Sequence, residues 1–231
     1  MIVYVDLEHD RLREQPKEYI PSLGRRLLQK YRFEKLTGDL CLLVRYDRVT
    51  PALLRELNAR AVLVSGCATD FEHYAEKDLA GLRQVFCEAA WPTIGFCGGH
   101  QIMAESYGAP IDAVGPLAPG EPEPVMPKNF GFKAGVRQER GFMPVRVTKP
   151  HPLLDGLGTR PMMFESHYWE VKSPPPGFEV YAETDMTGIQ MIAHKERPLF
   201  GTQFHPEQYD DDHLDGRKLL ENFFRIAGIT A

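Results

Sequence analysis

Apolar residues along this chain alternate between short continuous runs and longer stretches with helical spacing. The continuous runs lie at residues 2–6, 40–44, 61–64 and 92–96. Such runs predict strands that are covered on both faces, as in a parallel sheet. The stretches between them predict helices at about 19–32, from about Pro51, at about 76–90 and at about 98–107.

The predicted helices each group their apolar residues on one side. In the first helix, Leu23, Leu27 and Tyr31 share a face. Two further helices, at about 76–90 and 213–227, have apolar stripes. These stripes comprise Leu79, Leu82, Val85, Phe86 and Ala89 in the former, and Leu219, Leu220, Phe223 and Phe224 in the latter. Strands alternating with helices predict an α/β fold, a mostly parallel doubly wound (flavodoxin-like) sheet flanked by helices.

The pattern changes after Tyr107. Residues 115–127 are rich in proline and glycine and predict a loop, and residues 130–195 contain short alternating segments. We expect a small antiparallel β insertion in this second half, before residues 198–204 return to the sheet as a strand. With no internal repeat and no clear linker, residues 1–231 are expected to form a single domain.

Composition narrows the functional classes. The chain has 231 residues, 43% hydrophobic and 26% charged, and a net charge of −5, which argues against binding nucleic acid through its phosphates. No apolar run approaches the roughly 20 residues of a membrane helix, and Asp6 comes too early for a signal peptide. The four cysteines include no C-x-x-C pair, which favours reduced thiols in a cytoplasm. We expect no metal and no cofactor.

A candidate nucleophile follows the strand at 92–96. Cys97 lies in the run G-F-C-G-G-H-Q, whose glycines permit a tight strand-to-helix turn that exposes the side chain. The helix dipole contributes about 0.3–1 kcal/mol, less than the 1.36 kcal/mol that one pKa unit requires. The helix alone therefore cannot activate a thiol, and an imidazole is needed.

That imidazole is predicted at His205, which ends the strand at 198–204 and should emerge at the same sheet edge as Cys97. Glu207 follows in H-P-E and would orient the ring, giving a thiol, a base and an orienting carboxylate. His100 is expected to point away from the sulfur. A cysteine nucleophile that forms a thioester also needs hydrogen-bond donors for the negatively charged oxygen, the oxyanion, that develops during attack. We expect these donors to be the backbone amide of Gly98 and a second amide near Gly66 and Cys67, after the strand at 61–64.

These motifs resemble the class I (triad) glutamine amidotransferases. The match covers the G-x-C-x-G-H-Q elbow from Gly95 to Gln101 and the H-P-E at His205 to Glu207, and the motif order agrees across nearly the whole chain. Weaker matches lie at residues 65–66, 139–141, 165–167 and 216–223. The chain departs from the family where Ser65-Gly66-Cys67-Ala68 replaces the common Ser-Gly-Gly-Pro.

The resemblance implies a reaction and a substrate. Cys97 would attack the side-chain amide of glutamine, and His205 would protonate the departing ammonia. Gln101, Ser166 and His167 would help hold the amino-acid end of the substrate. The chain ends without a synthetase domain, so a separate synthetase partner that accepts the ammonia is expected. Two alternatives stay open: a hydrolase of other γ-glutamyl amides or peptides, and a catalytically silent regulatory or binding subunit.

Overall fold

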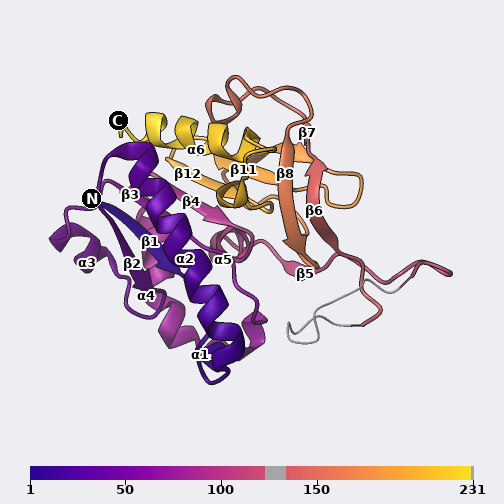
Figure 1. Ribbon diagram of the computed structural model, residues 1–231, viewed down its shortest axis with the longest axis horizontal. Helices are drawn as coiled ribbons and strands as arrows, with labels where there is room; N and C mark the ends of the chain where they lie inside the picture. The colour runs from indigo at the N-terminus through magenta and orange to yellow at the C-terminus, as the bar shows by residue number, and fades with distance from the viewer. Residues whose placement is uncertain (123–133, 230–231) are drawn as a thin grey trace.

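An eight-stranded sheet forms the centre of the protein (Figure 1). The computed structural model describes residues 1–122 and 134–229. The strand order is β2-β1-β3-β4-β12-β11-β10-β7. The first five strands are parallel: β2 (Cys41–Arg45), β1 (Ile2–Asp6), β3 (Ala61–Val64), β4 (Thr93–Phe96) and β12 (Leu199–Thr202). This is the flavodoxin-like order, so the predicted mostly parallel sheet is confirmed.

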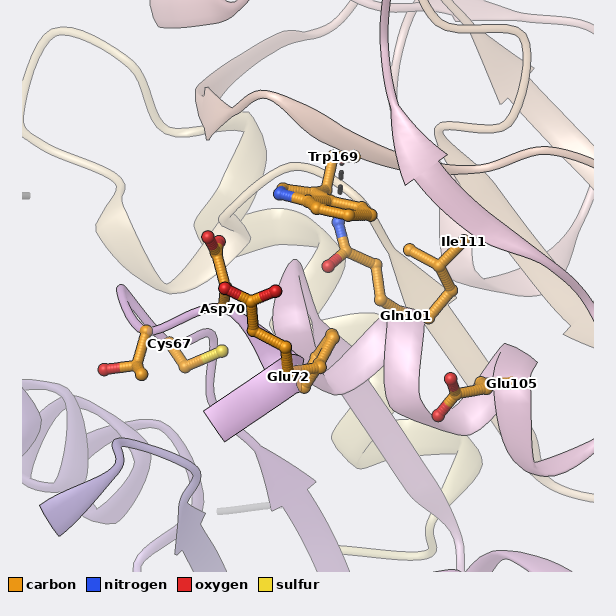
Figure 2. Close-up of a pocket in the computed structure, with 9 residues that line it drawn as sticks. Cys67, Asp70, Glu72, Gln101, Glu105, Ile111 and Trp169 are labelled. Atoms are coloured by element: carbon orange, nitrogen blue, oxygen red, sulfur yellow. Dashed lines mark hydrogen bonds between the residues drawn. The ribbon is translucent and has the colours of Figure 1, made fainter. Parts of the chain in front are cut away.

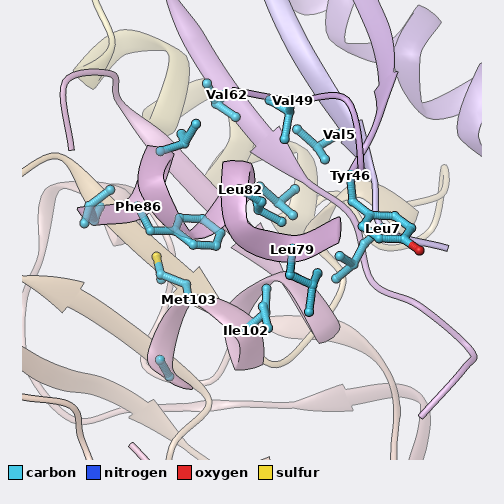
Figure 3. Close-up of a cluster of buried hydrophobic side chains, with 14 of the residues drawn as sticks. Val5, Leu7, Tyr46, Val49, Val62, Leu79, Leu82, Phe86, Ile102 and Met103 are labelled. Atoms are coloured by element: carbon cyan, nitrogen blue, oxygen red, sulfur yellow. The ribbon is translucent and has the colours of Figure 1, made fainter. Parts of the chain in front are cut away.

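Helices cover both faces of this sheet because its central strands are apolar on both sides. Val3 and Val5 of β1 face one core cluster, whereas Ile2 and Tyr4 face the other. The first cluster packs under α3 (Pro51–Glu56), α4 (Glu76–Glu88) and α5 (Gly98–Ser106). Figure 3 shows its side chains from α4 and α5. The second cluster packs under α2 (Pro16–Thr37) and α6 (Asp215–Ile226). Among the described residues, no helix is both long enough and apolar enough to cross a bilayer.

Helix α2 reverses the usual relation between apolar residues and burial. Leu27 and Tyr31 share a face as expected, but this face lies toward solvent, with 38% and 57% of the residue surface exposed. The buried face is largely polar: Ser22, Arg26, Gln29, Phe33 and Thr37. The reason is that polar groups of the sheet, among them the hydroxyl of Tyr4, lie beneath the helix and need partners.

The remaining strands form the antiparallel part that the alternating segments predicted. Strands β11 (Met191–His194), β10 (Phe178–Glu183) and β7 (Arg146–Val147) extend the main sheet in antiparallel fashion. Two further antiparallel pairs lie beside it, β6 (Glu139–Pro144) with β8 (Met162–His167), and β5 (Ile111–Ala113) with β9 (Trp169–Val171). Of the loop predicted at 115–127, residues 123–127 lie outside the described residues, as do 130–133 of the alternating region.

Short helical segments complete the chain: α1 (Asp10–Arg13) and the 3-10 turns η1 (Phe71–His73), η2 (Pro152–Leu154) and η3 (Pro206–Gln208). Strands β3, β4 and β12 are neighbours and run in the same direction. Their carboxyl ends therefore meet at one edge of the sheet. The segments that follow them bring Gly66, Cys97 and His205 close together there.

Candidate active site

Cys97 occupies a tight turn between β4 and α5. Its backbone has φ 46° and ψ −106°, a left-handed conformation that non-glycine residues seldom adopt. Its amide donates to the carbonyl of Thr202 at 2.7 Å, and its carbonyl accepts from the amide of Gln101 at 2.9 Å. A Cβ atom on Gly95 would lie 2.4 Å from the carbonyl oxygen of Gly99, so the turn needs glycine there. The turn thus joins the strand to the helix and holds the sulfur at the sheet edge.

The imidazole of His205 lies between this sulfur and a buried carboxylate. Its Nδ1 contacts Oε1 of Glu207 at 2.7 Å, and Glu207 is fully buried. Burial alone would lower the pKa of His205, but the charge of Glu207 and the interaction with Cys97 outweigh burial and raise that pKa. The three groups expected from the two motifs therefore lie close together: Glu207 contacts Nδ1, and Cε1 of the ring and Cβ of Cys97 lie 2.9 and 3.3 Å from the Cβ position of Gly66.

The sulfur has two other neighbours. The side-chain amide of Gln203 donates to Sγ of Cys97 at 3.5 Å, and the carbonyl of Ser166 lies 3.8 Å from Sγ. Gln203 is fully buried and also accepts from Nε2 of Gln101 at 3.0 Å. The sequence reasoning missed Gln203. Its only signal was a polar residue inside an apolar strand end, in G-T-Q-F-H-P-E.

The backbone at Gly66 approaches the sulfur and the imidazole closely. A Cβ atom on Gly66 would lie 2.9 Å from Cε1 of His205 and 3.3 Å from Cβ of Cys97. A Cβ atom on Gly98 would lie 3.1 Å from the backbone nitrogen of Cys67. The backbone nitrogen of Cys67 thus lies beside Gly98, the residue that follows Cys97.

A pocket lies beside Cys67 and Gln101 (Figure 2). Nε2 of Gln101 donates to the carbonyl of Trp169 at 2.8 Å, which leaves the side-chain oxygen of Gln101 to face the pocket. The lining includes three carboxylates, those of Asp70, Glu72 and Glu105. Acceptors of this kind suit a ligand with a donor group, such as an ammonium.

His167 is buried, with 3% of its surface exposed, and both ring nitrogens contact protein groups. Nδ1 donates to the carbonyl of Trp169 at 3.0 Å, and Nε2 lies 2.9 Å from Glu139 and 3.3 Å from Glu165. Burial alone would lower the pKa of His167, but the contacts with these carboxylates outweigh burial and raise that pKa to about 10. His167 reaches Gln101 through the shared carbonyl of Trp169.

Glu139, Glu165 and His167 are also the kind of set that can ligate a divalent cation, since one donor atom from each lies within 4.8 Å of the others. A ligating imidazole must offer a free lone pair. Here Nε2 of His167 lies 2.9 Å from Glu139 and 3.3 Å from Glu165, and these carboxylates raise the pKa of His167, which favours a proton on Nε2. These three residues therefore form an ionic cluster.

The ring of His100 packs against the backbone of Gly201. It is fully buried, and burial lowers the pKa of His100 to about 3. The backbone of Gly201 lies directly against this ring, because a Cβ atom there would lie 2.4 Å from Nδ1. His100 is thus a neutral packing residue.

The model of the family described as glutamine amidotransferase class-I matches residues 35–227. The chain belongs to the class I glutamine amidotransferases. This amidotransferase is 30% identical over 186 residues to a glutamine-hydrolyzing GMP synthase of Nitratidesulfovibrio vulgaris, which covers 79% of this chain and 31% of that protein. The chain therefore spans about a third of the length of that relative.

Two further likenesses agree with this membership. The amidotransferase is 28% identical over 162 residues to a glutamine-hydrolyzing GMP synthase subunit of Pyrococcus furiosus, covering 70% of this chain and 68% of that relative. A solved glutamine amido transferase from Methylobacillus flagellatus has a TM-score of 0.63 at 14% identity, covering 100% of this chain and 95% of the other. At that identity the structural match speaks for the fold alone.

Proposed function

We propose that this chain hydrolyses the side-chain amide of glutamine to glutamate and ammonia through a thioester on Cys97. Cys97 gives its thiol proton to His205 as the sulfur attacks the amide carbon, and the C–N bond breaks as His205 passes a proton to the departing ammonia. Water then attacks the thioester, and His205 takes a proton from it. The C–S bond breaks, the sulfur recovers its proton, and glutamate leaves.

The observation that carries this proposal is that the thiol of Cys97 and the paired side chains of His205 and Glu207, which come from distant parts of the chain, lie together at one edge of the sheet. Glu207 holds Nδ1 of His205 at 2.7 Å, and the ring of His205 and the side chain of Cys97 meet at the Cβ position of Gly66, 2.9 and 3.3 Å from it. The negative charge that develops on the carbonyl oxygen needs donors, and the backbone amides of Cys67 and Gly98 are suited to that task. Removing one such donor typically costs about 10²–10³ in rate.

The pocket supports glutamine as the substrate. The side-chain oxygen of Gln101 and the carboxylates of Asp70, Glu72 and Glu105 all accept hydrogen bonds, and they suit the α-ammonium group of an amino acid. We assign Ser166 and His167 to the same end of the substrate. His167 would act by fixing the carbonyl of Trp169 and thereby Gln101, rather than by touching the substrate.

We also propose that the ammonia passes to a separate synthetase. Support comes from the relatives, one of which is itself a single subunit of a glutamine-hydrolyzing GMP synthase. In the longer relative, the matched part is about a third of the protein. Synthetase chemistry would then reside on a different polypeptide segment from the one described here.

The decisive experiment is a glutaminase assay on the wild type and on Cys97→Ser, with any co-purified partner present. We expect glutamate release by the wild type and a loss of at least about 10³-fold in the variant. Undiminished activity in Cys97→Ser would refute the proposal. A substrate panel gives the second arm, since a strong preference for γ-glutamyl dipeptides over glutamine would assign the triad to peptide hydrolysis instead.

A further inference from the structure

Arg26 is a buried cation that the proposed reaction does not use directly. It projects from α2, has 7% of its surface exposed, and its guanidinium donates to three acceptors. Nε donates to Asp6 at 3.2 Å, Nη1 to Gln29 at 3.3 Å and Nη2 to the carbonyl of Gly66 at 2.7 Å. Burying a charge is costly unless it is paired and hydrogen-bonded.

Its partners hold the guanidinium in one orientation. Asp6 ends β1, and Gln29 lies one helical turn after Arg26 and accepts from the hydroxyl of Tyr4 at 2.6 Å. Both are buried. The contact with Gly66 is the shortest of the three, and charged donors make stronger hydrogen bonds than neutral ones. The fork of Arg26 therefore fixes a loop carbonyl relative to the sheet and the helix.

The direction of that carbonyl decides where the next amide points. The peptide bond between Gly66 and Cys67 is planar and trans, so the N–H of Cys67 points opposite to the C=O of Gly66. With the carbonyl turned toward Arg26, the amide turns to the side where its nitrogen lies 3.1 Å from the Cβ position of Gly98. We infer that Arg26 is a positioning residue that aims the amide of Cys67 at the oxyanion, an assignment that rests on the proposed function.

A second donor reaches the same carbonyl. The hydroxyl of Ser65 donates to the carbonyl of Gly66 at 2.8 Å and accepts from the amide of Leu7 at 2.9 Å. This neutral bond comes from the adjacent residue in the loop itself, whereas Arg26 ties the loop to a different element. Ser65→Ala should accordingly lower activity less than the loss of Arg26.

The test compares Arg26→Met with Arg25→Met, the same change at the exposed preceding position, in the full chain. In Arg26→Met we expect kcat for glutamine to fall about 10- to 100-fold. This is at most the smallest loss seen when an oxyanion donor is removed outright, about 10²-fold. KM should stay within about threefold. Labelling of Cys97 by a chloromethyl ketone analogue of glutamine should slow similarly, because its carbonyl develops an oxyanion as sulfur adds. Alkylation by iodoacetamide develops no oxyanion and should be unchanged.

An equal slowing of iodoacetamide alkylation, an equal loss in Arg25→Met, or a larger loss in Ser65→Ala would overturn the assignment. Arg26→Met leaves the buried carboxylate of Asp6 without its cation. The comparison of wild type with Arg26→Met is therefore repeated in an Asp6→Asn background. The ratio of kcat between Asp6→Asn and Asp6→Asn/Arg26→Met should equal the ratio between wild type and Arg26→Met. A wild type that neither hydrolyses glutamine nor reacts with the ketone would refute the proposed function itself. An active wild type with an equally active Arg26→Met would overturn only the role of Arg26.

Discussion

The ionic cluster of Glu139, Glu165 and His167 makes a sharp prediction because its two carboxylates are held differently. Glu139 accepts from His167 at 2.9 Å and from the amide of Gln190 at 2.7 Å. Burial alone would raise the pKa of Glu139, but the hydrogen bond with His167, a hydrogen bond from Thr184 and the charge of His167 outweigh burial and lower that pKa. Burial raises the pKa of Glu165, although its Oε2 lies 3.3 Å from Nε2 of His167 in an ion pair; neither oxygen accepts a hydrogen bond among the described residues.

Matched glutamine substitutions should therefore have unequal effects. Glu139→Gln removes the anion that neutralises a buried imidazolium, and breaking such a pair costs about 3–5 kcal/mol. For a chain of this size each kcal/mol lowers Tm by about 2–4 °C, so a fall of about 6–20 °C is expected. Glu165→Gln removes a charge that burial already disfavours, while the shape is kept. Its cost should stay below about 1 kcal/mol.

Thermal unfolding followed by circular dichroism at pH 7 measures both variants against the wild type. Urea titrations at 25 °C give the free energies of unfolding independently of the thermal midpoint. If Glu165→Gln proved as destabilising as Glu139→Gln, or if neither changed stability, our account of this cluster would be refuted.

Three more outcomes are expected. Gly66→Ala should reduce glutamine turnover by at least about 10²-fold while the protein stays folded, since the added methyl would lie 2.9 Å from Cε1 of His205; turnover near the wild-type rate would contradict this. Gly201→Ala should cost about 1–3 kcal/mol in thermal unfolding, because its Cβ would lie 2.4 Å from the ring of His100, and an unchanged Tm would speak against that packing. The pKa of His167 is raised to about 10 in the folded state, so protonated His167 stabilises the fold fully below about pH 6.5, and this stabilisation is lost as the pH rises through about 10. Urea titrations between about pH 7 and 10.5 measure the free energy of unfolding, and a value that did not change with pH would contradict this prediction.

Hydrophobic pattern was enough to predict the sheet but not the packing of α2. Continuous apolar runs identified β1, β3 and β4, because strands covered on both faces have few polar positions. Helix α2 lies over polar groups at the edge of the sheet, so Arg26 and Gln29 are buried while Leu27 is exposed. A helical wheel shows where apolar residues gather, but the carbonyl of Gly66 that Arg26 satisfies comes from 40 residues away.

Part of the candidate site could likewise be predicted from the sequence, and part could not. Cys97, His205 and Glu207 were predictable because each follows a strand in a distinctive local motif, and strand ends in parallel sheets meet at one edge. The buried setting of His167 was not, because its segment has the polar composition of a loop. Its partner Glu139 becomes visible only from the register of β6 with β8, in which the two residues are opposite each other.

The left-handed backbone at Cys97 carries a consequence for selection. A non-glycine residue in such a conformation costs of order 1–3 kcal/mol, and glycine would relieve much of it. The most heat-resistant form of this protein is thus expected to lack its own nucleophile. Directed evolution that selects only for thermal stability would favour replacement of Cys97 by glycine, which gives an inactive protein. Cys97 is retained only when catalysis is selected together with stability.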